Sequence, residues 1–115
     1  MLPNRMQLDR QTEDHLKRLK SQTGLTPNVS ARIAFFRSIE SDFLYKGEIK
    51  KLDGTLALDK ATWLGDTASI TELVLKLKYP TLDSRDLMKA WAAHVDDGIA
   101  ALRNHKSLLS FSAAL

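Results

Sequence analysis

The sequence predicts a mainly α protein with a single domain of about four helices. Four stretches place apolar side chains at the spacings of three and four residues that are typical of helices. Glycine or proline stands between most of these stretches, where helices end or begin. We divide the 115 residues into a basic N-terminal part (1–43), an irregular loop (44–66) and a helical hairpin with an apolar tail (67–115).

Residues 4–9 alternate polar and apolar side chains, which is the period of a short strand. So short a strand needs a partner, because alone it would expose unpaired backbone groups. In one interpretation a second copy of the chain supplies that partner. The alternative is an irregular N-terminal arm.

The first helix is expected over residues 10–22, with Asp9 or Thr12 as its cap. Gly24 is placed to end this helix, because glycine adopts the left-handed conformation without a Cβ clash. The helix is rich in lysine and arginine, so its outer surface is either a solvated face or a rim that contacts phosphate.

The second helix is expected over residues 27–43. The hydroxyl of Thr26 is predicted to cap it, and Pro27 takes the first helical position, where its missing N–H costs nothing. A helix, a glycine turn and a second capped helix form a helix-turn-helix pattern. Many DNA-binding proteins use this pattern, but it is also a common way to pack two helices.

The second helix has a wide apolar arc, so we expect two of its sides to be buried, the second by another subunit. A homo-oligomer follows, with a tetramer as the first choice and a dimer as the second. The residues predicted at its interface are Gly24, Phe35 and Ile39.

In the loop at 44–66, the turn signal Asp53-Gly54 fits either a small hairpin or a wandering segment. The third helix is expected over residues 67–78, where Ser69 and Glu72 have capping-box spacing; alternatively, Asp66 begins the helix earlier. Its predicted core face consists of Ile70, Leu73, Val74 and Leu77.

The fourth helix is expected over residues 84–104, with Gly98 marking a close helix contact. Its apolar seam consists of Met88, Trp91, Ala92, Val95, Ile99 and Leu102. The tail contains Leu108, Leu109 and Phe111 and is expected to pack on its own domain or on a neighbour.

Chemistry-bearing motifs are scarce. The chain has no cysteine, which excludes disulfides, thiol nucleophiles and cysteine-ligated clusters. It has no phosphate-binding glycine loop, and we interpret His94 and Asp97 as an exposed hydrogen-bonded pair rather than a metal site. We therefore expect a binding protein without enzymatic activity, cofactor or metal. It has no membrane span or signal peptide in its sequence, so we expect it in the cytoplasm.

Segments along nearly the whole chain resemble the DndE family, small proteins of bacterial DNA phosphorothioation (sulfur-modification) systems. The resemblance lies in the runs Leu8–Thr12, His15–Lys20, Thr23–Asn28, Arg32–Phe35, Thr62–Asp66, Lys89–His94 and Asp97–Ile99. It implies a helical subunit acting with a cysteine desulfurase, an iron–sulfur protein and an ATPase, which together replace a non-bridging phosphate oxygen of DNA with sulfur.

The N-terminal third also resembles ribbon-helix-helix repressors, in which paired strands enter the major groove. In that arrangement Arg5 and Gln7 would face bases, with Asp9 at the next outward position. A carboxylate there is a poor neighbour for phosphate.

Charge is uneven along the chain. Residues 1–37 hold seven Lys/Arg against three Asp/Glu, whereas residues 38–115 hold ten against eleven. With the resemblance, this favours a non-enzymatic subunit that binds duplex DNA, including nicked duplex, through its backbone. The predicted DNA contacts are Lys17, Arg18, Lys20, Thr26, Asn28, Arg32, Lys46, Lys50 and Lys51. The alternative is a protein-interaction scaffold of the same modification complex that does not touch DNA.

Overall fold

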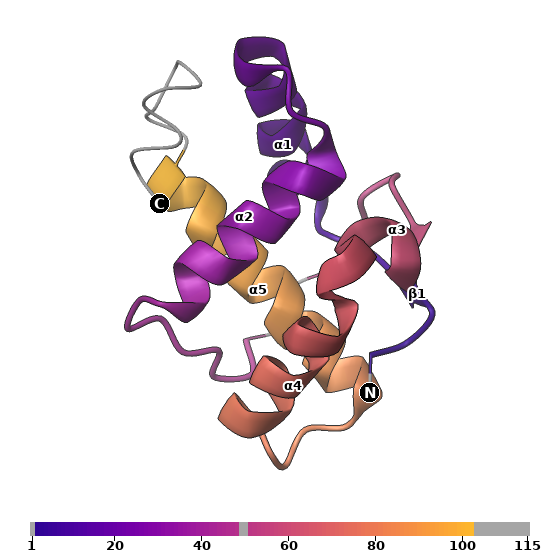
Figure 1. The fold of residues 1–115 in the computed structure, drawn as a ribbon, viewed down its shortest axis with the longest axis vertical. Coiled ribbons are helices and arrows are strands. Elements are labelled where there is room, and N and C mark those ends of the chain that lie inside the picture. The colour runs from indigo at the N-terminus through magenta and orange to yellow at the C-terminus, as the bar shows by residue number, and fades with distance from the viewer. Residues whose placement is uncertain (1, 49–50, 103–115) are drawn as a thin grey trace.

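The computed structural model describes residues 2–48 and 51–102. It is mainly α, as predicted, with two long helices crossing at its centre (Figure 1). The helices are α1 (Arg10–Thr23), α2 (Pro27–Ile39), α3 (Lys60–Leu64), α4 (Ala68–Lys78) and α5 (Ser84–Leu102), with a 3₁₀ turn η1 (Gly65–Thr67) before α4. Within the described residues, no helix is both long and apolar enough to cross a membrane.

The ends of α1 confirm the predicted signals. The carboxylate of Asp9 accepts a hydrogen bond from the backbone N–H of Thr12, which caps the first turn. Gly24 ends the helix in the left-handed conformation at φ 79°, and its N–H donates to the carbonyl of Lys20.

Helix α2 begins at Pro27 as predicted, but Thr26 makes no capping bond through its side chain. The helix also ends at Ile39, four residues before the predicted end at 43. The hydroxyl of Ser41 donates to the carbonyl of Ser38 and accepts from the N–H of Phe43. These local bonds take the place of the next helical turn.

The core forms where α2 crosses α5. A Cβ atom added to Gly98 would lie 1.9 Å from the carbonyl oxygen of Ala34, so only glycine allows the two backbones to come this close. The predicted close contact at Gly98 is therefore confirmed. The seam of α5 is also confirmed, and Trp91 of that seam packs edge-on against Trp63, with ring centroids 5.5 Å apart.

The N-terminal strand is real but its partner lies within the same chain. Strand β1 (Arg5–Met6) pairs antiparallel with β2 (Leu58–Asp59), so this pairing replaces both interpretations, the irregular arm and the partner strand from a second copy. The indole N–H of Trp63 donates to the carbonyl of Met6, which fixes α3 against this small sheet.

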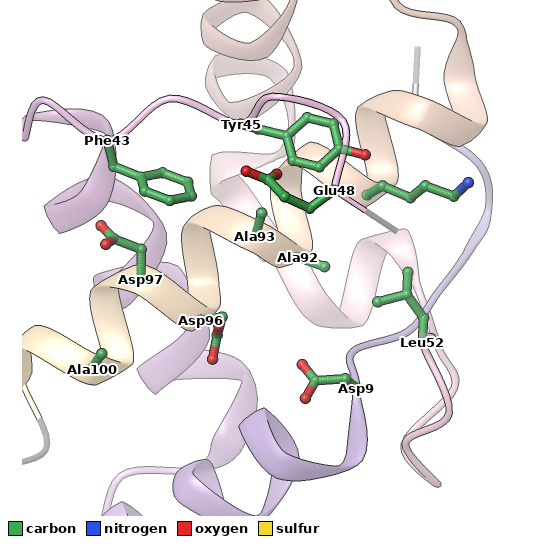
Figure 2. Close-up of a pocket in the computed structure, with 11 residues that line it drawn as sticks. Asp9, Phe43, Tyr45, Glu48, Leu52, Ala92, Ala93, Asp96, Asp97 and Ala100 are labelled. Atoms are coloured by element: carbon green, nitrogen blue, oxygen red, sulfur yellow. The ribbon is translucent and has the colours of Figure 1, made fainter. Parts of the chain in front are cut away.

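The loop 44–66 contains more structure than predicted, since it includes β2, α3 and η1. Asp59 caps α3 by accepting from the N–H of Thr62. The Asp53-Gly54 turn forms no hairpin. Gly54 instead donates its N–H to the carbonyl of Leu8, at a point where a Cβ atom would collide with Glu13. At the start of this loop and just before it, Tyr45 and Phe43 lie over one face of α5 (Figure 2).

Helix α4 presents the opposite face from the one predicted. Ile70, Leu73 and Leu77 are 47%, 53% and 74% exposed, whereas Thr71 and Leu75 are buried. The predicted capping box is also absent, because no side chain caps the start of α4. The carboxylate of Glu72 is used elsewhere, in an ion pair with the ammonium of Lys60 at 2.8 Å. The predicted tail packing, and the last two residues of the predicted fourth helix, lie outside the described residues.

Candidate nucleic-acid interface

The outer face of α1 carries the predicted basic side chains. Lys17, Arg18 and Lys20 are all exposed, as is Arg10, which the sequence analysis did not select. Successive helical residues are about 100° apart, so residues 10, 17 and 20 share one edge while Arg18 points elsewhere. In the sequence, this edge is indicated by the spacing of seven residues from Arg10 to Lys17 and of three residues from Lys17 to Lys20.

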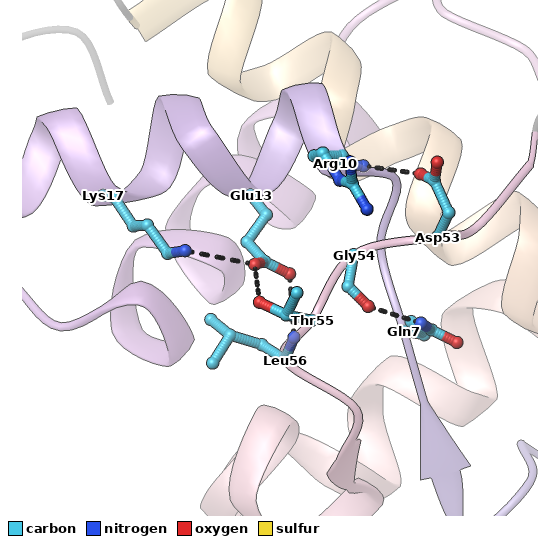
Figure 3. A network of polar contacts seen from close by, with 8 residues as sticks. All are labelled: Gln7, Arg10, Glu13, Lys17, Asp53, Gly54, Thr55 and Leu56. Atoms are coloured by element: carbon cyan, nitrogen blue, oxygen red, sulfur yellow. Dashed lines mark hydrogen bonds and ion pairs between the residues drawn. The ribbon is translucent and has the colours of Figure 1, made fainter.

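One of the two acidic residues of α1 is turned away from that face. The carboxylate of Glu13 is buried beneath the loop, where it accepts from the hydroxyl of Thr55 and the N–H of Leu56 (Figure 3). Lys17 lies on its outer side, with the ammonium 3.2 Å from the carboxylate. Asp14 is the one carboxylate that the structure leaves exposed on this helix. The outer face of α1 is therefore positive.

Hydrogen bonds decide the charge of Glu13. Burial alone would raise its pKa, but the hydroxyl of Thr55, the N–H of Leu56 and the ammonium of Lys17 stabilise the ionised form. Together they lower the pKa below its ordinary value. The carboxylate is thus charged at neutral pH and ties the loop to α1.

The predicted contacts on α2 have internal partners. The guanidinium of Arg32 donates to the carbonyls of Trp63 and Thr62 at 2.9 and 3.0 Å. The amide of Asn28 donates to the carbonyl of Thr62 as well, at 3.2 Å. These bonds hold α3 against α2, and Thr26 lies exposed before them.

The loop lysines do not continue the edge of α1 as a single rim. Lys46 and Lys51 are exposed, and Lys50 lies outside the described residues. Lys46 follows Tyr45, whose N–H donates to the hydroxyl of Tyr79 beyond the end of α4. Lys51 precedes Asp53, which accepts from the N–H of Arg10. Of the two, Lys51 lies near a bond to the start of α1, and Lys46 lies beside a bond to the end of α4.

The three predicted interface residues differ in their surroundings. Gly24 is exposed, and a Cβ atom there would meet nothing within 4 Å of its own chain. Phe35 is 1% exposed and packs inside the chain against the rings of Phe36 and His94. Its burial needs no second subunit. Ile39 is half-buried.

His94 and Asp97 do not form the exposed pair that we predicted. His94 is buried, its Nδ1 lies 2.8 Å from the hydroxyl of Ser38, and that hydroxyl donates to Asp97. On the other side, Nε2 lies 2.6 Å from the hydroxyl of Tyr79. Because the N–H of Tyr45 can only donate and the carboxylate can only accept, the protons along this chain all point towards Asp97.

In this direction the imidazole proton lies on Nδ1, and Nε2 accepts from the hydroxyl of Tyr79. Burial, and then the positive charge of Lys78, lower the pKa of His94 to about 4. The hydroxyl proton of Ser38 is directed at the carboxylate rather than at the imidazole, which is not the arrangement of an activated nucleophile. In the part of the chain that the structure describes, no three His, Cys, Asp or Glu side chains are grouped to hold a metal ion.

Comparisons with known proteins identify the family of this chain. Residues 5–110 match the model of the family described as DNA sulphur modification protein DndE. The crystal structure of DndE from Escherichia coli B7A, involved in DNA phosphorothioation modification, is 67% identical with a TM-score of 0.87, covering 89% of this chain and 100% of that one.

A glycine-to-lysine mutant of DndE, also involved in DNA phosphorothioation, is 65% identical with a TM-score of 0.83, and the match covers 88% of this chain and 98% of that one. A comparison with curated proteins gave no match. The extent of the family match and the identity to both crystal structures agree: the chain belongs to the DndE family.

Proposed function

We propose that this protein is a non-enzymatic DNA-binding subunit of a bacterial DNA phosphorothioation system. It holds duplex DNA, including nicked duplex, by the phosphate backbone. The observation that supports this most is the outer face of α1, where Arg10, Lys17 and Lys20 are exposed and Glu13 is turned inward. The two solved relatives are both described as involved in phosphorothioation.

A reaction on the DNA backbone favours recognition by charge and shape over base reading. One subunit offers few cations on this edge, so we propose that assembly into a homo-oligomer multiplies them. A tetramer is the first choice for this assembly, and a dimer is the second. The exposed turn at Gly24 is where subunits meet. The partners implied are the other subunits of the complex, in the cytoplasm: a desulfurase, an iron–sulfur protein and an ATPase.

The test is a titration of the pure protein against intact, nicked and single-stranded DNA at several salt concentrations. Lys17→Ala with Lys20→Ala should weaken binding to all sequences and lower the salt slope by roughly one per lysine. Lys76→Ala with Arg85→Ala removes two exposed cations elsewhere and should leave both quantities close to wild type. An unchanged slope in the first variant contradicts the assignment.

A second candidate function is a scaffold for other proteins. Its support is the apolar stripe of Ile70, Leu73 and Leu77, which α4 turns to solvent. Capture of a partner subunit by the Lys17→Ala, Lys20→Ala protein, and loss of that capture in Leu73→Ser with Leu77→Ser, would favour this role. DNA binding by the second variant would separate the two functions.

A further inference from the structure

We propose that the groove over α5 binds a segment of a partner protein that presents an arginine or lysine side chain beside an apolar one. This acidic groove lies between α5 and the loop residues 43–48 and 51–52, and its volume is about 330 Å³. It is a different surface from the outer edge of α1, so the inference stands whether or not that edge binds DNA.

The floor and one wall of the groove are apolar. Ala92, Ala93 and Ala100 of α5 form the floor, and their small side chains leave the hollow open. Phe43 and Tyr45 stand above them as an aromatic wall (Figure 2). The ring of Phe43 is held edge-on against His94, with centroids 5.0 Å apart, so this wall is fixed by the core.

Four carboxylates surround this apolar floor: Asp9, Glu48, Asp96 and Asp97. The one cationic side chain among the described lining residues is Lys89, whose ammonium lies 3.7 Å from Asp86. The groove is therefore acidic in a chain whose net charge is +3. Such a surface repels phosphate and attracts a cation.

Internal hydrogen bonds hold all four of these carboxylates in place: Asp9 accepts from the N–H of Thr12, and Glu48 accepts from the N–H of Lys46. Asp97 accepts from Ser38 at the end of the buried proton chain. Asp96 lies 2.9 Å from the hydroxyl of Thr12 at the start of α1. Because the scaffold fixes these groups before any ligand arrives, a bound cation would not have to order them.

The lining of the groove suits an organic cation better than a metal ion. No group of three ligating side chains suited to a metal occurs in the described part of the chain. The aromatic rings and methyl groups of the groove supply no ligand atoms for a metal ion. Arginine and lysine combine an apolar stem with a charged head. The stem fits against Phe43 and Tyr45, with cation–π attraction, while the head meets the carboxylates.

The probe is the peptide acetyl-Ala-Leu-Arg-Leu-Ala-amide, titrated into the ¹⁵N-labelled full chain. Its control has citrulline in place of arginine, which keeps the shape and removes the charge. We expect amide shifts at Ala92, Ala93 and Ala100, and binding of the citrulline peptide that is weaker by about tenfold or more. Equal binding of both peptides, or no shift with either, overturns the proposal.

Substitution locates the site. Glu48→Gln with Asp97→Asn should weaken the arginine peptide by about tenfold, since the amide of asparagine can still accept from Ser38. Glu40→Gln with Asp66→Asn removes two exposed carboxylates outside the groove and should leave affinity unchanged. If a DNA duplex shifts the groove residues instead, or if Arg103→Gln with Lys106→Gln shifts them without peptide, the occupant is not a partner protein.

Discussion

The outer edge of α1 and the acidic groove carry opposite charges for different structural reasons. On α1 the cations point outward because Glu13, the acid nearest to them, is drawn under the loop by Thr55 and Leu56. In the groove the acids line the hollow, where Thr12 contacts Asp9 and Asp96 and Ser38 donates to Asp97. The first region keeps a positive outer surface although Glu13 stays charged, because that carboxylate lies beneath it beside Lys17, and the second is made acidic by fixing acids.

This contrast teaches that charge along the sequence does not give the charge of a surface. The N-terminal part supplies lysines to α1 but also Asp9 to the groove. Both regions are joined to the same framework, because Thr12 of α1 contacts Asp96 of α5 and Ser38 of α2 donates to Asp97 of α5. Variants that disturb the framework should therefore have larger effects than variants that disturb one region. Variants outside both should have the smallest effects.

The largest effect is expected from Gly98→Ala. The new Cβ atom would meet the carbonyl of Ala34 and force α2 and α5 apart, at a cost of about 3 kcal/mol in the free energy of unfolding. Urea denaturation at fixed protein concentration measures it. Ala101→Ser, an exposed change on the same helix, should cost less than about 0.5 kcal/mol. Equal stabilities of the two variants would refute the close contact.

The next effect concerns acid and the buried proton chain of the groove. The unfolded chain protonates His94 near its ordinary pKa of 6.5, whereas the folded protein resists protonation down to about pH 4. Stability should therefore fall as pH is lowered from 6.5 to 4, by up to about 3 kcal/mol.

Denaturation at a series of pH values checks this prediction. His94→Asn should be less stable at pH 7 and should lose less stability over the same pH interval. His15→Asn replaces a half-buried histidine outside the proton chain and serves as the matched control. A wild type whose stability does not change between pH 6.5 and 4 would contradict the neutral, buried imidazole.

A smaller effect is expected at the inner side of the α1 edge. Glu13→Gln removes a buried charge that accepts from Thr55 and Leu56, and should cost about 1–2 kcal/mol of stability. Because the lowered pKa of Glu13 keeps it ionised in the folded state, the wild type holds this stability above about pH 4.5 and loses it as pH falls further. The wild-type advantage over Glu13→Gln should shrink in acid.

DNA affinity gives Glu13→Gln a second readout. Freed from its ion pair, Lys17 keeps its charge, so binding should be as tight as in wild type or tighter. Asp14→Asn, on the exposed face, should change stability by less than about 0.5 kcal/mol. A loss of DNA affinity in Glu13→Gln comparable to that of the double lysine variant would mean that Glu13 orders the DNA site.

Local signals were sufficient for the parts of the fold that local chemistry decides. Asp9, Gly24 and Pro27 marked helix ends correctly, because capping and backbone conformation depend on neighbours in sequence. Gly98 was also identified, since a glycine inside an apolar seam has few other uses. The mainly α class followed from these signals together with periodicity.

Long-range contacts explain the failures. The stripe of Ile70, Leu73 and Leu77 has the periodicity of a core face, but the core accepts Leu75 and Thr71 instead. Arg32 was expected at the surface and is bound by carbonyls thirty residues away. No residue spacing in the sequence indicates hydrogen bonds to such distant carbonyls.

A substitution at Gly24 is expected to change the free energy of unfolding least among these predictions, but to change the oligomeric state strongly. Asparagine tolerates the left-handed conformation, so Gly24→Asn should cost at most about 1 kcal/mol while adding a side chain at the exposed turn. Gly47→Asn is the matched control, because Gly47 is also exposed, at φ 84°, with nothing within 4 Å of an added Cβ atom. Sedimentation should shift towards monomer for the first variant alone.

This variant also tests whether assembly links the two regions. If subunits meet at the turn after α1, their separation reduces the number of lysine edges on one DNA molecule, and the salt slope should fall with the sedimentation coefficient. The acidic groove lies within one subunit and should still bind the arginine peptide. A monomeric variant with an unchanged salt slope would show that a single α1 edge is enough, and that assembly serves another purpose.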